Sequence, residues 1–477
     1  MAARYEDKEV LPPVLKKERL FIYLMRVFTN IIDKGNIMLT TKYVRDHLDE
    51  IRESLDRRKS DYPLGELLEL DARWRSAKTE LQALKTRKNR ASMEISSMKK
   101  EGKESAIVES AIGALSEIKE KERKIERELP AYEERIEHLL LNMPNTLHKS
   151  VPYGTDDSQN VEIRKWGERE KRDGKSHEEI LTGLGLIDLE RAAKVAGARF
   201  YYLKGEISLL EQSLIRFALD ELAGKGYTAI SPPMMMKREM YKGVTSLGDF
   251  EDALYRVADT KEAAERDRGE RMEEELFLIS TSEHAIAAMH AGEVFSAKEL
   301  PLRYAGVSPC FRREAGSHGK DTKGIFRVHQ FYKVEQFIFA GADDSYKFFD
   351  ELMSNSEDIY KKLGIPYRVV DICTGDIGIV AARKNDIEGY MPGQDRYREL
   401  VSCSNCTDWQ SLRLDIKYDD GGERKFVHTL NSTAIATTRT IVAIVENYAN
   451  GDGTIEVPKA LVKYMGKERI GKPKSQA

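Results

Sequence analysis

Two long apolar seams separated by a single glycine-containing turn constrain the fold of this chain more than any other feature of its sequence. Apolar or small residues recur at alternating spacings of three and four in both seams, the first from Leu67 to Met98 and the second from Val108 to Met143. Such a repeat is typical of a coiled coil. Because Gly102 lies between the seams, the sequence predicts an antiparallel helical hairpin. At 1.5 Å per residue, each arm should extend roughly 48 Å.

Polar or helix-breaking residues interrupt both seams. Lys88 breaks the first seam, and Glu122 breaks the second. Pro130 lies inside the second seam, where a proline should kink or loosen a helix, and Pro144 should end it. We therefore expect two long helices whose apolar stripes are imperfect.

Charge is distributed unequally between the two predicted helices. Between Arg75 and Lys103 there are nine basic and three acidic residues, which gives a net charge of +6. Between Glu104 and Glu128 there are five basic and seven acidic residues, which gives −2. A helical hairpin with one basic helix suits contact with a nucleic-acid backbone. A solvated coiled-coil surface explains the same charges, so the hairpin alone leaves both interpretations open.

The rest of the chain predicts an α+β domain rather than a doubly wound one. Residues 151–180 combine proline, glycine and a charged run, as in a linker. From 181 to 466, helical stretches mix with strand-like runs such as 337–339 and 367–372 without regular alternation. This pattern indicates a mostly antiparallel sheet flanked by helices. The basic tail, residues 467–477, is expected to lack structure.

Composition excludes several classes of protein. The chain has only four cysteines, no export signal at its start and no long apolar run, which disfavours secreted, disulfide-stapled and membrane-spanning proteins. We therefore expect a cytoplasmic protein. Cys403 and Cys406 form a CxxC pair, but no second pair accompanies them, so buried free thiols are favoured over a zinc site. The net charge of −3 means that nucleic-acid binding would depend on local charge segregation.

Three polar segments remain once familiar nucleotide motifs are excluded. Neither a GxxxxGK[ST] loop nor a GxGxxG loop is present, so a P-loop or Rossmann site has no support. The three segments are residues 226–233, residues 309–316 with 324–335, and residues 428–439. Their arginines could hold phosphate, and their aromatic residues could stack on a base. Taken singly, each segment is also compatible with a buried salt bridge or a helix cap.

Together, these segments resemble the three motifs of the class II aminoacyl-tRNA synthetases, and more narrowly those of the seryl-tRNA synthetases. The strings that support this resemblance are residues 198–205, 281–283, 310–316, 328–335, 399–405 and 430–439. The hairpin, with its basic run at 85–90, is similar to the tRNA-binding arm of that family. In the third motif, Ser432, Thr433 and Thr438 resemble the archaeal and eukaryotic branch, and Arg439 is retained.

The resemblance implies a domain plan. It predicts a tRNA-binding domain at 38–150, a linker at 151–180 and a class II catalytic domain at 181–466. Residues 1–37 fall outside the family pattern and are interpreted as an extension of unknown role, either dispensable or a start-site artefact. N-terminal sequencing of the native protein that began at Met1 would exclude the artefact.

The resemblance also implies the reaction. Serine and ATP would form seryl-adenylate and pyrophosphate, and serine would then be transferred to tRNA(Ser). The expected partners are L-serine, ATP, tRNA(Ser) and a second copy of the chain, with tRNA(Sec) left open as a further substrate. Mg²⁺ is the expected cofactor, with no zinc and no membrane partner.

Site residues follow from the resemblance motif by motif. The expected catalytic residues, which neutralise phosphate charge or hold metal, are Arg312, Arg439 and Glu399. The residues expected to bind ATP are Arg312, Glu314, Arg327, Val328, Phe331, Glu399, Ser402 and Arg439. Within this set, Glu399 and Ser402 are the expected Mg²⁺ ligands, Glu314 would accept from the adenine amino group and Phe331 would stack on the ring.

Serine and tRNA are assigned to two further sets. The residues expected to bind serine are Thr281, Glu283, Arg312, Glu335, Asn431 and Thr433. Thr281 and Glu283 would take the ammonium group, and Glu335 would take the hydroxyl. The residues expected to contact tRNA are Lys85, Arg87, Lys88 and Arg90.

Three other interpretations remain at this point. A threonyl-type synthetase would need zinc ligands in its amino-acid pocket and would lack the hairpin. A non-catalytic synthetase-like binding module would be indicated by loss of a motif arginine, but Arg312 and Arg439 are both present. A purely structural coiled-coil protein does not explain the polar segments that follow residue 225.

Overall fold

The protein divides into two compact units in the computed structural model. The structure describes residues 35–170, 175–246, 253–257, 275–314 and 323–471. Most of the expected N-terminal extension therefore lies outside the described residues. The hairpin unit comprises residues 35–49 and 63–140, and the sheet unit comprises residues 50–62 and 141–471.

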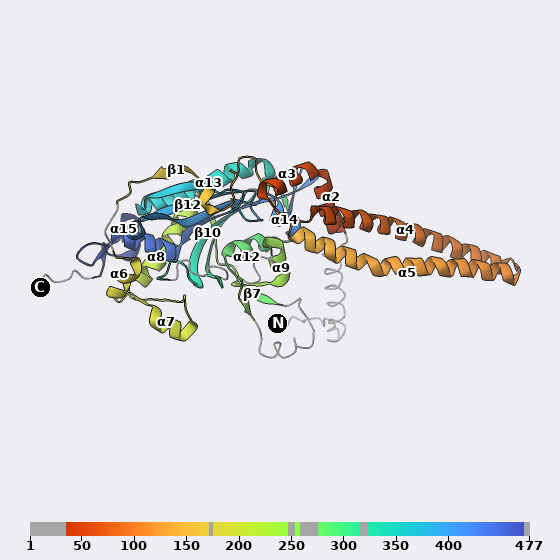
Figure 1. The fold of residues 1–477 in the computed structure, drawn as a ribbon, viewed down its shortest axis with the longest axis horizontal. Coiled ribbons are helices and arrows are strands. Elements are labelled where there is room, and N and C mark those ends of the chain that lie inside the picture. The colour runs from red at the N-terminus through yellow and green to blue at the C-terminus, as the bar shows by residue number, and fades with distance from the viewer. Residues whose placement is uncertain (1–34, 171–174, 247–252, 258–274, 315–322, 472–477) are drawn as a thin grey trace, which may run out of the picture. The chain divides into compact units, whose positions relative to one another are not determined.

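The predicted antiparallel hairpin is confirmed. Helices α4 (Leu64–Lys100) and α5 (Ser105–Leu141) have 37 residues each and lie side by side (Figure 1). At 1.5 Å per residue, each helix is about 55 Å long, because each begins three residues before the first residue of its apolar seam. α5 continues through Pro130. The turn between the helices contains Gly102 at a φ of +65°, a backbone conformation that glycine adopts without steric cost.

The two polar interruptions of the seams face each other. The Lys88 Nζ lies 2.5 and 2.7 Å from the two carboxylate oxygens of Glu122, whose side chain is buried between the helices. A polar pair inside an apolar seam fixes the register of two helices at some cost in stability. What appears in each seam as a defect is therefore one shared polar layer.

Two shorter helices precede the hairpin in the chain. In α2 (Gly35–Asp46), Arg45 bonds at 2.7 Å to Asp71, a buried carboxylate of α4. α3 (Leu48–Arg58) begins in the hairpin unit and continues into the sheet unit from residue 50 onward. The same stretch of helix therefore belongs partly to each unit.

An eight-stranded sheet forms the centre of the sheet unit and confirms the predicted α+β class. All of its strand pairs are antiparallel except the pair of β4 and β9. In sheet order the strands are β1 (Val161–Trp166), β11 (Tyr367–Asp371), β12 (Arg383–Met391), β13 (Arg396–Asn405), β16 (His428–Ala436), β10 (Gln330–Ala340), β9 (Leu302–Phe311) and β4 (Thr228–Ile230).

Helices cover both faces of this sheet (Figure 1). Ile338 of β10 packs in a core with four helices: α8 (Glu206–Ala223), α13 (Ser345–Leu363), α15 (Thr437–Tyr448) and α16 (Lys459–Met465). Its neighbours Phe337 and Phe339 pack in a second core with α9 (Arg238–Val244), α12 (Ser282–Met289) and α14 (Trp409–Leu414). Because side chains alternate along a strand, the two cores lie on opposite faces.

Smaller elements complete the sheet unit. The remaining helices are α6 (His177–Gly183) and α7 (Leu189–Ala196). The remaining strands form small sheets of β5 (Met235–Lys237), β7 (Leu276–Leu278) and β6 (Arg256–Val257), of β15 (Glu423–Phe426), β14 (Lys417–Asp420) and β8 (Val294–Ser296), of β17 (Ile455–Glu456) and β18 (Arg469–Ile470), and of β2 (Ile187–Asp188) and β3 (Tyr202–Leu203).

Two segments expected to be irregular contain regular structure. The linker interpretation of 151–180 was wrong for residues 161–166, which form β1 at the edge of the main sheet, with every side chain exposed. An edge strand that is exposed throughout has a loop-like composition. The tail also begins with β18, and Lys467 pairs with Glu206, so its first residues are ordered. Residues 472–477 lie outside the described part.

All four cysteines are buried and form no disulfide. Among the described residues, none of the helices has a stretch long and apolar enough to cross a bilayer.

Candidate active site

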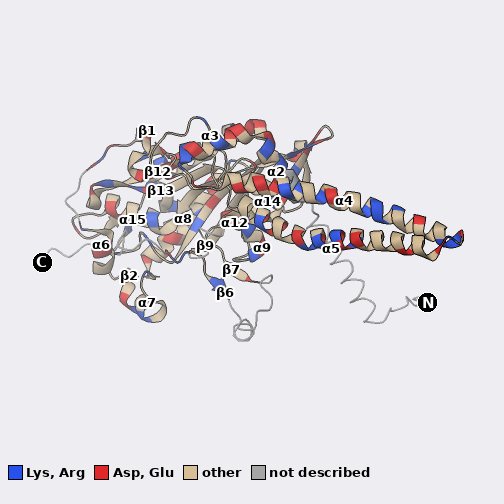
Figure 2. Ribbon diagram, turned by 45° about the vertical axis from the view of Figure 1, so that its right-hand side comes forward, with Lys and Arg blue, Asp and Glu red and all other residues tan. Residues whose placement is uncertain are grey.

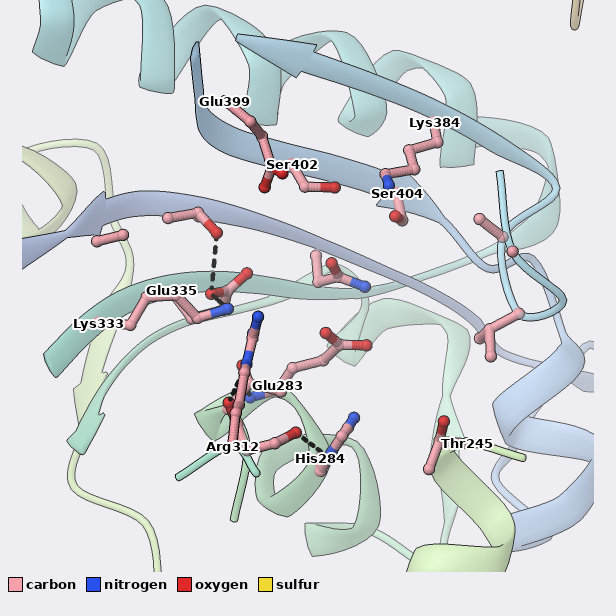
Figure 3. Close-up of a pocket in the computed structure, with 18 of the residues that line it drawn as sticks. Thr245, Glu283, His284, Arg312, Lys333, Glu335, Lys384, Glu399, Ser402 and Ser404 are labelled. Atoms are coloured by element: carbon pink, nitrogen blue, oxygen red, sulfur yellow. Dashed lines mark hydrogen bonds and ion pairs between the residues drawn. The ribbon is translucent and has the colours of Figure 1, made fainter. Parts of the chain in front are cut away.

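A cavity of about 560 Å³ opens on the face of the main sheet that carries α12 (Figure 3). Most of the predicted catalytic and substrate-binding residues line it. They are Thr281, Glu283, Arg312, Glu314, Phe331, Glu335, Glu399, Ser402, Asn431, Thr433 and Arg439. Residues more than 150 positions apart in the sequence therefore converge on one space.

Arg312 directly follows the end of β9 and lines the cavity. Its backbone N–H bonds to the carbonyl of His329, which fixes the start of the loop to the neighbouring strand. Its guanidinium lies 5.3 Å from the centre of the Phe331 ring, and its Nε donates to the carbonyl of Ser280 at 3.4 Å. The guanidinium is held on one side of the cavity by an aromatic ring.

Arg439 and Glu399 form the second charged group of the cavity. The Arg439 Nη1 donates to the Glu399 Oε1 at 2.9 Å and to the backbone carbonyl of Glu399 at 3.2 Å. Arg439 stands in the first turn of α15, directly after β16 ends. The nearby guanidinium lowers the pKa of Glu399 to about 2, so the carboxylate is ionised at neutral pH.

The buried carboxylate of Glu335 and the half-buried carboxylate of Glu283 also line the cavity. Glu335 accepts from Lys333 at 2.5 Å and from the Thr433 hydroxyl at 3.4 Å. Glu283 accepts from the Gln410 amide at 3.4 Å. Burial, with a contribution from neighbouring Glu335, raises the pKa of Glu283 to about 7. Burial also raises the pKa of Glu335, against the opposing charges of Lys333 and Arg312.

Thr281 has a structural role beside its predicted one. Its hydroxyl accepts from the backbone N–H of Glu283 at 3.2 Å and so caps the N-terminus of α12. The cap positions the Glu283 side chain at the start of the helix. Thr281 also lines the cavity, so the same residue shapes and borders the site.

Two predicted ATP-binding side chains do not line the cavity. Val328 is 2% exposed and packs in the core beneath the sheet, so only its backbone could serve a ligand. Arg327 donates to Glu314 at 3.0 Å and orients that carboxylate from behind. In the sequence, both positions belong to a motif string, which does not reveal which side chains face inward.

Several cavity residues were missed by the sequence analysis. Lys333 lies two positions before Glu335 on β10, so strand periodicity could have placed both on one face. His284 is buried beside Ser280, and burial together with Lys333 and Arg312 lowers its pKa to about 3, so its ring is neutral. Lys384 lies 3.8 Å from Asp386, and carboxylates around Lys384 raise its pKa despite its burial.

One wall of the cavity is a loop that no motif indicated. Residues 376–381, here called the pocket loop, line it between β11 and β12. Most of these residues are apolar or glycine, residue types that do not indicate a role in binding.

The four residues predicted to contact tRNA lie in the hairpin unit and differ in their surroundings. The Nζ of Lys85 lies 3.1 Å from Glu126, and Lys88 is held in the buried pair with Glu122. Arg87 and Arg90 are exposed, and the latter bonds to Glu94 one turn on. Figure 2 shows basic residues along α4. The two arginines are therefore better placed than Lys88 to meet an external ligand.

Comparison with known proteins covers nearly the whole chain. Residues 38–147 match the model of the family described as "Seryl-tRNA synthetase N-terminal domain", and residues 260–448 match that of "tRNA synthetase class II core domain (G, H, P, S and T)". The chain is similar to the Serine--tRNA ligase of Methanoculleus marisnigri, with 48% identity over 437 residues that cover 90% of this chain and 99% of the relative. It is also similar to that of Pyrococcus horikoshii, with 44% identity and coverage of 91% and 97%.

Solved structures agree with the sequence relatives. The structure of seryl-tRNA synthetase from Pyrococcus horikoshii complexed with ATP matches with a TM-score of 0.82 and 43% identity, covering 91% of this chain and 99% of that one. The cytoplasmic Serine-tRNA ligase from Naegleria fowleri in complex with AMP matches with a TM-score of 0.77 and 38% identity, covering 91% and 98%.

Proposed function

This chain belongs to the seryl-tRNA synthetase family, and from that premise we propose how its residues perform the reaction of a serine–tRNA ligase. The enzyme activates serine with ATP and charges tRNA with it. The observation that carries the assignment of roles is that Arg312, Arg439 and Glu335 line one cavity. Threonyl-type, non-catalytic and purely structural interpretations are set aside by family membership.

The first step needs charge neutralisation rather than a base. A serine carboxylate oxygen attacks the α-phosphorus of ATP, the bond to the bridging oxygen breaks, and pyrophosphate leaves. Arg312, near the centre of the cavity, would hold both the serine carboxylate and the α-phosphate. Arg439 would take the charge of the leaving phosphates. Two fixed guanidiniums in a confined space stabilise the charge that develops in the transition state.

Glu399 and Ser402 fit a Mg²⁺ ion that also binds the phosphates. Both line the cavity, and Glu399 is ionised because of Arg439. Among the residues that the structure describes, no group of three or more His, Cys, Asp or Glu side chains could hold a metal ion by itself. Mg²⁺ commonly uses one or two protein oxygens together with substrate phosphates, so this donor set suits it. When bound, the ion would shield the negative charge of the leaving group.

Adenine recognition would involve three residues in unequal roles. Phe331 would stack on the base and Glu314 would accept from its amino group, since both line the cavity. Arg327 would keep the Glu314 carboxylate in place through their bond at 3.0 Å. Arg327, predicted to bind ATP, would thus also support binding through this pair.

Serine selection would depend on the buried carboxylates. Glu335, bonded to Lys333 and Thr433, would bind the hydroxyl of serine, and Glu283 would bind its ammonium group. A site built to bond a hydroxyl rejects an analogue without it by roughly 10⁴–10⁵, because buried polar groups would be left unpaired. Alanine is excluded in this way, and threonine is excluded by lack of room for one more methyl group.

The hairpin would recognise tRNA(Ser) through its backbone phosphates. The net charge of +6 between Arg75 and Lys103 and the exposure of Arg87 and Arg90 support this role. Phosphate contacts release counterions, so affinity for tRNA should fall steeply with salt. We also propose a cytoplasmic homodimer in which α8 and the following segment contribute to the contact between copies.

Pyrophosphate exchange into ATP with each of the twenty amino acids tests the proposed specificity. Serine alone should support exchange, and Glu335→Ala should remove it without unfolding the protein, as judged by circular dichroism. Exchange with serine at the wild-type rate in that variant would remove Glu335 from the pocket. Exchange with threonine at a rate similar to that with serine would contradict the selection described above.

A further inference from the structure

The chain segments that border the hairpin helices are bonded to the pocket loop within the sheet unit. Arg58 is the last residue of α3, shortly before α4 begins, and Asn145 follows shortly after α5 ends. Both belong to the sheet unit. The sequence did not predict a role for either side chain.

Asn145 makes bonds to two walls of the cavity. Its backbone N–H donates to the Ile379 carbonyl at 2.7 Å. Its side-chain Nδ2 donates to the carbonyls of Val380 and Cys406, both at 2.8 Å. Ile379, Val380 and Cys406 all line the cavity. One buried amide thus joins the pocket loop to the end of β13.

Arg58 makes a second set of bonds to the same loop. Its guanidinium donates to the carbonyls of Gly378 and Ala381, the latter at 3.1 Å, and to the carbonyl of Asn145 at 2.9 Å. Burial, with the nearby charge of Arg57, lowers the pKa of Arg58 to about 10. The Arg58 guanidinium is still charged at neutral pH, and it donates hydrogen bonds to backbone carbonyls.

The neighbouring Arg57 offers an internal comparison. Its guanidinium donates to the carbonyls of Val151 at 2.6 Å and His148 at 3.4 Å. Neither carbonyl belongs to the pocket loop. Two adjacent arginines on one helix therefore have similar bonding, but only Arg58 reaches the loop.

We propose that Asn145 and Arg58 are positioning residues that fix the pocket loop and, through Cys406, the serine end of the cavity. The Cys406 Sγ accepts from Asn431 at 3.6 Å, and Asn431 is one of the proposed serine-binding residues, so this inference rests on the proposed function. Loss of the Asn145 side-chain hydrogen bonds would leave the cavity walls at Val380 and Cys406 without this restraint. Serine binding should suffer more than ATP binding, because Cys406 is bonded directly to Asn431, whereas the proposed adenine contacts Phe331 and Glu314 lie on β10 and shortly after β9.

The test is pyrophosphate exchange without tRNA, in which KM is measured separately for serine and for ATP. Asn145→Asp keeps the shape of the side chain but replaces its donor with an oxygen that faces two carbonyl oxygens. We expect its KM for serine to rise about tenfold or more, equivalent to losing one or two buried hydrogen bonds, and its KM for ATP to change by about twofold at most. Arg58→Ala should show the same division, and Arg57→Ala, the matched control, should not.

Thermal unfolding of each variant separates positioning from stability. If Asn145→Asp fails to fold, Arg58→Ala decides the question. An unchanged KM for serine, an equal rise in both KM values, or the same division in Arg57→Ala would overturn the proposal. Absence of serine-dependent exchange in the wild-type enzyme would instead overturn the proposed function.

Discussion

Ion pairs in the two units show how differently the same residue types behave. In the hairpin unit, Lys85 and Glu126 pair with 43% and 45% of their side chains exposed. In the sheet unit, Lys333 and Glu335 pair with 8% and 1% exposed. Exposed pairs contribute little to stability and leave their charges available to partners, whereas buried pairs shift pKa values and demand complete bonding. The charges of the hairpin are therefore mostly accessible to solvent, whereas those of the cavity are held in fixed positions by their partners.

The largest effect should come from removing a charge of the cavity. Arg439→Ala should lower the kcat of pyrophosphate exchange by about 10³-fold, because one preorganised charge next to the leaving group is lost. The matched change in the hairpin, Arg90→Ala, should leave exchange unchanged. A loss of exchange in Arg90→Ala would contradict the assignment of this reaction to the sheet unit alone.

Shortening the hairpin should produce the opposite pattern. Replacing residues 89–121 by a short glycine turn retains the Lys88–Glu122 pair and removes Arg90. Charging of tRNA(Ser) should fall by about 10²-fold or more because phosphate contacts are lost, and exchange should stay within about twofold of wild type. Equal losses in aminoacylation and exchange would show that the hairpin supports the fold of the sheet unit.

The Glu283 carboxylate predicts a pH dependence confined to the cavity. Burial raises its pKa to about 7, and only the ionised form attracts the serine ammonium group. The kcat/KM for serine should therefore rise as pH increases from 6 to 8, by up to about tenfold per unit below the pKa. Glu283→Gln should flatten this part of the profile, and tRNA affinity should not follow it. A profile of the same shape in Glu283→Gln would assign the titration to another group.

The smallest effect should come from the polar layer of the hairpin. Lys88→Ala leaves the Glu122 carboxylate buried without its cation, which should cost about 1–2 kcal/mol of local stability after allowance for the part-exposed lysine. Lys85→Ala, beside an exposed partner, should cost less than about 0.5 kcal/mol. Amide hydrogen exchange of α4 and α5 measures both. Equal protection in the two variants would show that burial of Glu122 does not matter.

Sequence periodicity predicted the hairpin well because each helix carries its own repeat, and neither repeat depends on distant residues. It could not show that Lys88 and Glu122 meet, since that pairing depends on the register between helices. The edge strand β1 was missed because all of its side chains are exposed, so it has no buried face to produce a pattern.

The candidate site was predictable where motif strings carry distinctive side chains, as at Arg312 and Arg439. It was not predictable where the wall is made by backbone, as in the pocket loop, or where a side chain acts on carbonyls from another part of the chain, as Asn145 does. Val328 belongs to a motif string but has a buried side chain, so the string alone does not tell which part of the residue could meet a ligand. Residue identity indicates chemistry, and only the fold determines which side chains reach the ligand.

The Lys88–Glu122 layer also limits how the length of the hairpin can change over evolutionary time. Insertion of a whole heptad into one helix would preserve its apolar stripe. It would shift the charged residues beyond the insertion by about 10 Å relative to the other helix, or roughly three nucleotide steps of 3.4 Å. When the insertion precedes Lys88 or follows Glu122, the same shift would separate these two residues and break the ion pair. We therefore expect the hairpin to lengthen through matched insertions in both helices, which keep the Lys88–Glu122 pair.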